Sequence, residues 1–403
     1  MSALATDIAP PVTPAMLALL ARAGMPGKVH LTPLRGGANN RVYLARGHGQ
    51  ALVVKHYFQH ADDHRDRLAA EYAFACYAWQ LAPQFVAQPI ACDPRHRLAA
   101  YAFIPGRDFA GVAIDARHVD DAICLVRALQ QGVACRASPV AAVLECGGLD
   151  TALALGGATT APPQAKAASL PPHSKAQPVP AADVPLASDA CFSLDDHLRS
   201  LHRRVTRLAS ISPITSVDKQ ARDLVHHEIA PRVEQMTAAL DAHAWTPAEH
   251  DIMALRTPSP SDFGFHNAII GDDGRTRFID FEYAGWDSLV KLTCDFFTQV
   301  AAPVPITHLE RFVAGVFASS EGGGDAGGDA GGDAAPALAL CRRLLPLYRL
   351  KWCLIVLNDF LPAADLRRRF AQAPGPDDAA RQATKARQLH KAAALFRQIE
   401  VPA

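Results

Sequence analysis

The sequence predicts an α+β fold in which a β-rich first quarter is followed by a mostly helical remainder. Five short runs rich in β-branched and aromatic residues fall between residues 29 and 103, with one long helical run among them. After residue 115 the apolar residues recur with a helical period, as Val119, Ile123 and Val126 do. The 403 residues are enough for two or three domain-sized cores, and 49% of them are apolar, which is typical of a globular protein.

Most of the expected strands lie in the first part of the chain, and most of the expected helices lie in the second part. The first part is expected to contain a helix at 16–23, strands at 29–34, 41–46 and 51–57, a helix at 62–81, and strands at 85–91 and 97–103. The second part is expected to contain helices at 115–131, 193–208, 217–244, 306–318, 336–360 and 377–398. The helix at 217–244 should kink or split at Pro231. A further helix should begin at Thr246, because Thr246-Pro247-Ala248-Glu249 has the pattern of a capping box.

Two segments differ from the rest in composition. Residues 147–190 are rich in Ala, Pro, Gly and Ser, and their seven prolines exclude a continuous helix. Residues 320–335 repeat the unit Gly-Gly-Asp-Ala. We expect a disordered insertion at about 147–190 and a flexible linker at about 320–335.

Charge and cysteine usage limit the classes of partner. Forty basic and forty acidic residues cancel, so nothing attracts the chain to nucleic acid or to an anionic membrane. The nine cysteines form no C-x-x-C pair and are expected to be reduced thiols. The apolar stretch 344–361 contains Arg349, Lys351, Asn358 and Asp359, which indicates a core helix rather than a membrane span. The first eleven residues lack the features of a signal peptide, and we therefore expect a cytoplasmic protein.

The β-rich part contains three features that suit a nucleotide. The first two strands flank Gly36-Gly37-Ala38-Asn39-Asn40, where glycines would let backbone N–H groups approach a phosphate, although an ordinary hairpin turn is the alternative. Lys55 closes the third strand, and Glu71 lies sixteen residues later in the expected helix. Either residue alone is more often a solvated surface charge, but their order along the chain favours a common site.

The segment 259–282 carries the residues with the clearest chemistry. A carboxylate at Asp262, an amide at Asn267 and a second carboxylate at Asp280 lie close together along the chain. Apolar runs on either side of an Asp-Gly turn at 271–274 predict a β-hairpin, which would bring Asn267 and Asp280 side by side. Phosphoryl transfer needs a base or orienting group for a hydroxyl and oxygen ligands for Mg²⁺, and these three side chains supply both.

This spacing resembles that of the aminoglycoside phosphotransferase and choline kinase-like enzymes, which are small-molecule relatives of the protein kinases. The resemblance covers about residues 31–297 and is most specific at 262–282. It implies a protein-kinase-like bilobal fold, with an N-lobe at 1–104 and a C-lobe at 105–403. It also implies an enzyme that uses ATP, or GTP, and Mg²⁺ to phosphorylate a hydroxyl group of a small molecule.

The resemblance assigns roles to individual residues. Asp262 would be the catalytic base, and Asn267 and Asp280 would bind the metal. Lys55, paired with Glu71, would contact the α- and β-phosphates. The remaining contacts to the nucleotide would come from Gly36, Gly37 and Asn39 at the phosphates and from Ala102, Phe103 and Ile104 at the adenine edge.

Several points stay open at the level of sequence. The family usually has a His two residues before the catalytic Asp, and here that position is Pro260, which keeps a nucleotide-binding pseudokinase as the alternative. Either Asp287 or Asp295 is a candidate to brace the catalytic loop. The helix around Lys351 and Trp352 is a candidate wall of the acceptor site or an ordinary packing face. Residues 336–403 contain 12 basic and 5 acidic residues, a balance of 12 − 5 = +7, which argues against a polycationic acceptor contacted mainly there.

Overall fold

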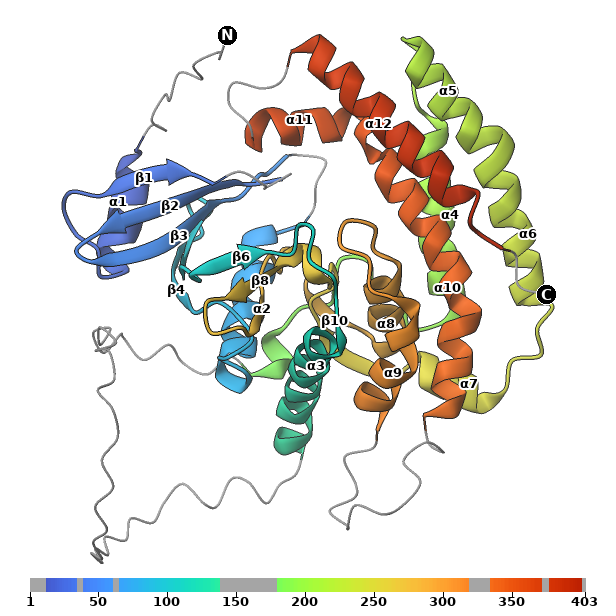
Figure 1. Ribbon diagram of the computed structural model, residues 1–403, viewed down its shortest axis with the longest axis horizontal. Helices are drawn as coiled ribbons and strands as arrows, with labels where there is room; N and C mark the ends of the chain where they lie inside the picture. The colour runs from blue at the N-terminus through green and yellow to red at the C-terminus, as the bar shows by residue number, and fades with distance from the viewer. Residues whose placement is uncertain are drawn as a thin grey trace, which may run out of the picture.

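The structure, a computed structural model, describes residues 12–34, 39–60, 65–137, 180–318, 334–371 and 377–400. A lobe built on a sheet (N-lobe, from α1 to β5) lies beside a helical lobe (C-lobe, from β6 onward), at the left and the right of Figure 1 respectively. The expected α+β fold with two lobes is confirmed.

The N-lobe contains an antiparallel five-stranded sheet with the strand order β1-β2-β3-β5-β4. Its strands are β1 (His30–Pro33), β2 (Arg41–Gly47), β3 (Gln50–His56), β4 (Pro89–Asp93) and β5 (Leu98–Ala102). Strand residues alternate between the two faces of the sheet. In β3 this alternation directs Leu52 and Val54 into one buried cluster with α1 (Pro14–Arg22), whereas Val53 and Lys55 line a cleft on the other face.

The helix and the strand that follow β3 differ from the expected bounds. Helix α2 (Arg67–Leu81) begins where the Asp66 side chain accepts the Ala69 N–H, and the expected start near residue 62 lies outside the described residues. Strand β4 begins at residue 89 rather than 85, because the chain before it pairs with the other lobe. Val86 forms a bridge with Phe278, and the Phe278 N–H donates to the Phe85 carbonyl at 2.7 Å.

The C-lobe begins with a small sheet that continues directly from β5. The predicted hairpin is confirmed as β8 (Ala268–Gly271) and β9 (Thr276–Phe278), with Gly274 in the turn at φ 77°. Strand β6 (Gly106–Asp108) pairs with β8. A Cβ at Gly106 would lie 2.1 Å from the Ile270 carbonyl oxygen, so this crossing between the lobes requires glycine.

Helices form most of the C-lobe, and α10 and α12 pack side by side (Figure 1). The helices are α3 (Ala116–Ala137), α4 (Leu194–Ala209), α5 (Ser216–Leu224), α6 (Ala230–Asp241), α7 (Pro247–Met253), α8 (Leu289–Thr298), α9 (Leu309–Phe317), α10 (Ala335–Val356), α11 (Pro362–Ala371) and α12 (Asp378–Phe396). A two-stranded ladder of β7 (Arg256–Ser259) with β10 (Gly285–Ser288) completes the lobe. Stacked rings connect the loop after β7 to the core, since Phe263 lies 4.9 Å from Phe296, which lies 4.7 Å from Phe312.

The helical run expected at 217–244 is interrupted by one wide turn, Val225–Ile229, just before Pro231. Proline has no N–H to donate, and its ring displaces the carbonyl four residues earlier, at His227. The displaced turn therefore widens to a π-type turn before α6 continues. The capping box expected at Thr246 is confirmed, with the Thr246 and Glu249 side chains bonded to each other's backbone N–H.

Part of the expected insertion is ordered. Most of residues 147–190 lie outside the described residues, but residues 180–190 pack against the C-lobe. The Trp286 indole donates to the Ala181 carbonyl at 3.0 Å, and the Trp286 N–H donates to the Pro185 carbonyl at 2.8 Å. The Ser200 hydroxyl donates to Asp189 at 2.9 Å. The disorder expected up to residue 190 is therefore wrong for residues 180–190, because these contacts hold that segment in place.

Helix α11 connects the two lobes. It follows a 3-10 turn (Leu357–Phe360) of the C-lobe, and its last turn reaches the N-lobe sheet, as Figure 1 shows near the top. The Phe370 ring lies 5.1 Å from His56, 5.4 Å from Phe58 and 4.6 Å from the Arg41 guanidinium. Arg41 also donates to the Phe370 carbonyl. Across the described part of the chain, none of the helices has the length and apolar character needed to cross a membrane.

Candidate active site

A cleft of about 390 Å³ lies between the two lobes. Both lobes contribute to its walls, and it contains the buried pair Lys55 and Glu71 as well as residues of the loop after β7. The described residues that the sequence assigned to nucleotide or metal all line it: Asn39, Lys55, Glu71, Ala102, Phe103, Ile104, Asn267 and Asp280. Gly36 and Gly37 lie outside the described residues.

Lys55 is held between two carboxylates from different lobes. Its Nζ lies 2.6 Å from Glu71 Oε1 of α2 and 2.7 Å from Asp280 Oδ1 of the C-lobe. Burial lowers the pKa of Lys55, but the charges of Asp280 and Glu71 reverse this effect and raise it above its ordinary value. The ammonium group is therefore charged and fixed in position at the centre of the cleft.

Glu71 is buried on the inner face of α2, with 2% of its surface exposed. Burial raises the pKa of its carboxyl to about 7, although the charge of Lys55 opposes this shift. Burial disfavours the ionised form of Glu71, and the charge of Lys55 stabilises that form. The two residues therefore stabilise each other's position.

The loop after β7 places Asp262 through a tight and strained turn. Ser261 has φ 61°, and the Asp262 N–H donates to the Pro260 carbonyl at 2.8 Å. A non-glycine residue in this region of backbone space is uncommon and occurs most often at functional sites. The turn directs the Asp262 side chain toward the residues that end the loop.

Two side chains hold the Asp262 carboxylate. The His266 Nε2 lies 3.1 Å from Oδ1, and the Asn267 amide donates at 3.2 Å to Oδ2 and at 3.0 Å to the Asp262 carbonyl. Burial raises the pKa of Asp262, but the hydrogen bonds from His266 and Asn267 and the charge of Lys351 outweigh it and lower the pKa. His266 was not predicted from the sequence, because a histidine four residues after an acid carries no signal without the loop geometry.

Asn267 and Asp280 lie at adjacent positions of the hairpin, as the sequence predicted. The Ile279 N–H donates to the Asn267 carbonyl at 2.9 Å, which brings the residue before Asp280 against the end of the loop. Asp280 has φ 66°.

The Asn267 amide nitrogen faces Asp262, so its amide oxygen remains for another partner. An amide and a carboxylate oxygen are hard donors that fit Mg²⁺, which keeps water or phosphate at its other positions. Consistent with this sparse donor set, the described residues contain no cluster of three His, Cys, Asp or Glu side chains that would form a complete metal cage.

Solved structures of small-molecule phosphotransferases share this arrangement of lobes. A spectinomycin phosphotransferase in complex with ADP and spectinomycin is 12% identical, and the match covers 96% of this chain and 99% of that one with a TM-score of 0.51. An ethanolamine kinase of Plasmodium vivax is 9% identical, with coverage of 92% and 84% and a TM-score of 0.50. This chain has the protein-kinase-like fold of those enzymes. No protein-family model matches the chain, and a search of curated proteins also found no match.

Within this kinase-like fold, Asn39 lines the cleft and its side chain is bound by the C-lobe. Its amide donates to Glu282 at 2.5 Å and to the Tyr283 hydroxyl at 3.1 Å. Asn40 donates to the other Glu282 oxygen at 2.7 Å, and Arg67 lies 2.8 Å from Glu282. Asn39 and Asn40, which lead into β2, are thus connected to the C-lobe just after Asp280.

In the segment 102–104, which connects the lobes, two backbone N–H groups already bond to the N-lobe. The Ala102 N–H donates to the Gln88 carbonyl at 2.9 Å, and the Phe103 N–H donates to the Ala51 carbonyl at 3.3 Å. An adenine at this edge would therefore have to use Ile104 or the carbonyl oxygens of the segment.

Asp287 and Asp295 belong to one chain of buried charges below the loop. Asp287 pairs with Lys291, which also lies 3.5 Å from Asp295. Lys351 donates to both oxygens of Asp295 at 2.8 Å. Asp287 lies opposite Thr257 in the β7–β10 ladder, on the strand that leads into the loop. The structure also shows that Lys351 packs inside the lobe with 7% of its surface exposed, so the packing interpretation holds for this residue.

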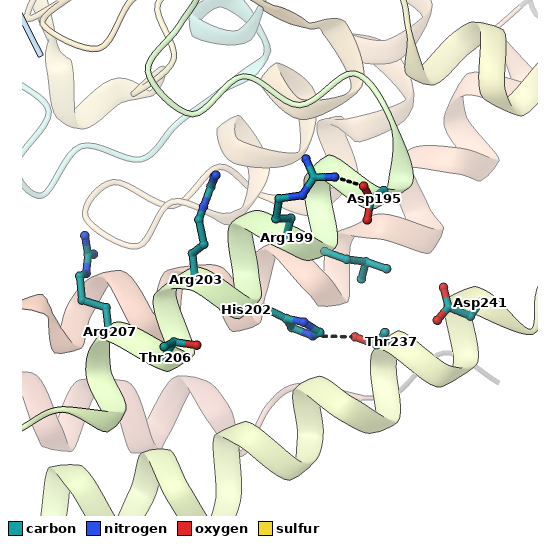
Figure 2. A pocket seen from close by; sticks show the side chains of 9 residues that line it. Asp195, Arg199, His202, Arg203, Thr206, Arg207, Thr237 and Asp241 are labelled. Carbon is teal, nitrogen blue, oxygen red and sulfur yellow. Dashed lines mark hydrogen bonds and ion pairs between the residues drawn. The ribbon is translucent and has the colours of Figure 1, made fainter. Parts of the chain in front are cut away.

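A second hollow of about 580 Å³ lies between α4 and α6 (Figure 2). None of the residues that the sequence assigned to a site lines it. Its arginines have partners within the fold, as Figure 2 shows for Arg199 with Asp195, and the His202 ring bonds to the Thr237 hydroxyl. Arg203 pairs with Asp189, and Arg207 donates to Asn358. The cleft between the lobes is therefore the better candidate for chemistry.

Proposed function

We propose that this protein is a Mg²⁺-dependent kinase that transfers the γ-phosphate of ATP to a hydroxyl group of a small molecule. The observation that carries the proposal is that Lys55, Asn267 and Asp280 line one cleft between two lobes, and that Asn267 also binds the Asp262 carboxylate. Phosphoryl transfer depends mainly on positioning and charge stabilisation, and these side chains provide both. The compared phosphotransferase binds ADP, which supports an adenine nucleotide here.

The residues divide the work as follows. Asp262 accepts the proton of the acceptor hydroxyl while the acceptor oxygen forms a bond to the γ-phosphorus and the bond between that phosphorus and the bridging oxygen of ADP breaks. Lys55, held by Glu71, binds the α- and β-phosphates. Asn267 and Asp280 would hold Mg²⁺, which neutralises charge on the phosphates when bound.

The acceptor is a small hydroxyl compound in this proposal. The two compared enzymes are named for spectinomycin and for ethanolamine, which differ greatly in size. His266, which bonds to Asp262, lies 6.4 Å from Trp352 of α10 between ring centroids. An apolar ring at this place favours an acceptor that presents a hydroxyl group next to an apolar surface.

A nucleotide-binding pseudokinase is the second candidate. Pro260 favours it, because proline cannot supply the contacts of the histidine expected there. The engagement of the Asn39 side chain by Glu282 and Tyr283 favours it as well.

Mass spectrometry separates the two candidates. The purified protein would be incubated with Mg²⁺-ATP, or Mg²⁺-GTP, and a metabolite extract, with Asp262→Asn as the control. A metabolite that gains one phosphoryl group only with the wild-type protein would support the kinase and identify its acceptor. Turnover by Asp262→Asn equal to that of the wild type would contradict the role of Asp262. Nucleotide binding without any product from several extracts would favour the pseudokinase.

A further inference from the structure

His266 occupies a position that fixes the orientation of Asp262. Its Nε2 lies 3.1 Å from Asp262 Oδ1, and an ionised carboxylate only accepts hydrogen bonds. Nε2 must therefore carry the proton and donate. The other ring nitrogen, Nδ1, is buried and has no hydrogen-bond partner among the described residues. The hydrogen bond to Asp262 is thus the polar contact that orients this imidazole.

The loop makes room for the imidazole at Gly264. The backbone of Gly264 is extended, with φ 167°, and any residue can adopt that conformation. A Cβ at this position would however lie 2.8 Å from His266 Nδ1 and 3.0 Å from Gln299 Cγ. Glycine is needed here for space. On its far side the imidazole meets the Trp352 ring edge-on, at 6.4 Å between centroids. The ring therefore packs closely against Gly264 and meets Trp352.

The Asp262 carboxylate is bound on both sides. His266 holds Oδ1, and Asn267 holds Oδ2 through the amide nitrogen. Asn267 is also assigned to the metal, so its position can change when a nucleotide and a metal bind. His266 is not assigned to the metal and can hold Asp262 in both situations.

We infer that His266 is a positioning residue that holds the Asp262 carboxylate in the orientation needed to accept the acceptor proton. The inference rests on the proposed function. The family that the sequence resembles usually has a histidine two residues before this Asp, but that position is Pro260 here, and a proline ring has no donor to offer. His266, which enters the loop from its other end, supplies that contact from a different position in the sequence.

The variants His266→Gln and His266→Asn both remove the ring, but only one of them should keep the hydrogen bond to Asp262. The Gln amide nitrogen lies at about the place of Nε2, whereas the Asn amide nitrogen lies at about the place of Nδ1. His266→Gln should therefore keep the hydrogen bond to Asp262, and His266→Asn should lose it. We expect kcat to fall by about a hundredfold in His266→Asn, because a misplaced reacting group costs about that much. In His266→Gln it should recover to within about tenfold of the wild type. The KM for ATP and the Kd for Mg²⁺-ADP should change little in both variants.

Two further variants test whether His266 acts through Asp262. Gly264→Ala should displace the imidazole and lower kcat while it leaves the histidine itself intact. Adding His266→Asn to Asp262→Asn should cause no further loss, because a positioning residue has no effect once the group it positions is gone. Activity is measured with the acceptor from the metabolite screen, or with water as the acceptor through phosphate release from Mg²⁺-ATP.

The outcomes distinguish failure of the inference from failure of the proposed function. If His266→Asn keeps wild-type kcat while Asp262→Asn is inactive, the inference is overturned and the proposed function stands. If Asp262→Asn is as active as the wild type, the proposed function fails first. Loss of Mg²⁺-ADP binding in His266→Asn would indicate a merely structural role and overturn the inference. If the wild type shows no turnover, crystal structures of the two amide variants decide. The carboxylate of Asp262 should keep its orientation in His266→Gln and turn in His266→Asn, and an unchanged carboxylate in both would refute the inference.

Discussion

Replacing Asp295 by Asn should strongly destabilise the C-lobe. Asp295 is 4% exposed and accepts two hydrogen bonds of 2.8 Å from Lys351, which is itself buried. Asparagine has the same shape but no charge, so the substitution leaves Lys351 as an uncompensated buried cation. Breaking a buried pair by removal of one partner costs about 3–5 kcal/mol. Lys291 keeps Asp287 as its partner, so we expect a value within that range rather than above it.

An exposed pair provides the matched control. Asp120 accepts two hydrogen bonds of 2.6 Å from Arg311, but the two side chains are 42% and 51% exposed. Asp120→Asn should therefore cost at most about 1 kcal/mol. The double variant Asp295→Asn with Lys351→Met should recover most of the loss, because it removes the buried cation as well.

Urea unfolding followed by tryptophan fluorescence measures these free energies, and an unchanged m value would show that the unfolded state is the same. The reasoning would be refuted if Asp295→Asn were as mild as Asp120→Asn. It would also be refuted if the double variant were destabilised by the sum of the two single changes, since the two charges would then act independently.

Three other predictions follow from contacts described above. Phe370→Ala should speed amide hydrogen exchange at the end of α11 and in the facing strands, because it removes the ring contacts that connect the lobes, whereas the exposed Leu366→Ala on the same helix should not. Glu71→Gln should weaken Mg²⁺-ADP binding by about tenfold in calorimetry, because Lys55 loses one of its two carboxylates. Burial, together with nearby lysines, lowers the pKa of His197 to about 3 from 6.5, so the folded protein binds fewer protons than the unfolded one and loses stability as the pH falls below 6.5. At pH 5 this histidine should lower the free energy of unfolding by about 2 kcal/mol relative to neutral pH. In urea titrations, His197→Asn should remove that part of the pH dependence.

Each of these predictions has a result that would contradict it. Equal exchange in Phe370→Ala and the wild type would show that α11 does not hold the N-lobe. Unchanged ADP affinity in Glu71→Gln would show that Asp280 alone positions Lys55. A constant stability difference between His197→Asn and the wild type from pH 7 to pH 5 would show that His197 does not stay neutral in the folded protein.

Local sequence patterns were sufficient to predict a structural feature where all the residues that form it lie in one short segment. The hairpin at 268–278 follows from its turn residues, and it places Asn267 beside Asp280 without help from the rest of the chain. The start of α7 follows from Thr246 and Glu249 for the same reason. The pairing of Lys55 with Glu71 joins a strand to a helix sixteen residues later. It was predictable only because the order of the two residues resembles that in the kinase-like family.

Other features depend on contacts between distant parts of the chain and left no local pattern. Phe85 and Val86 have strand-like composition, but a partner in the other lobe takes them out of the N-lobe sheet. Asn39 follows two glycines and suits a phosphate loop, yet Glu282, more than two hundred residues later, binds its amide. Residues 180–190 have the composition of an insertion, and their contacts with Trp286 and Ser200 explain why they are ordered.

Asp287 and Asp295, the two candidates to brace the loop after β7, lie in different places. Asp287 accepts the N–H groups of Cys191 and Ser288 while it stands opposite Thr257, so it fixes the strand that leads into the loop. Asp295 lies one helical turn beyond Lys291 and binds Lys351, whose charge in turn helps to lower the pKa of Asp262. The two carboxylates therefore act on the loop in different ways, one through backbone pairing and the other through a buried cation. Because Lys291 lies between them, a change at either carboxylate alters the electrostatic environment of the other. The loop is thus supported by the whole charge chain rather than by a single aspartate.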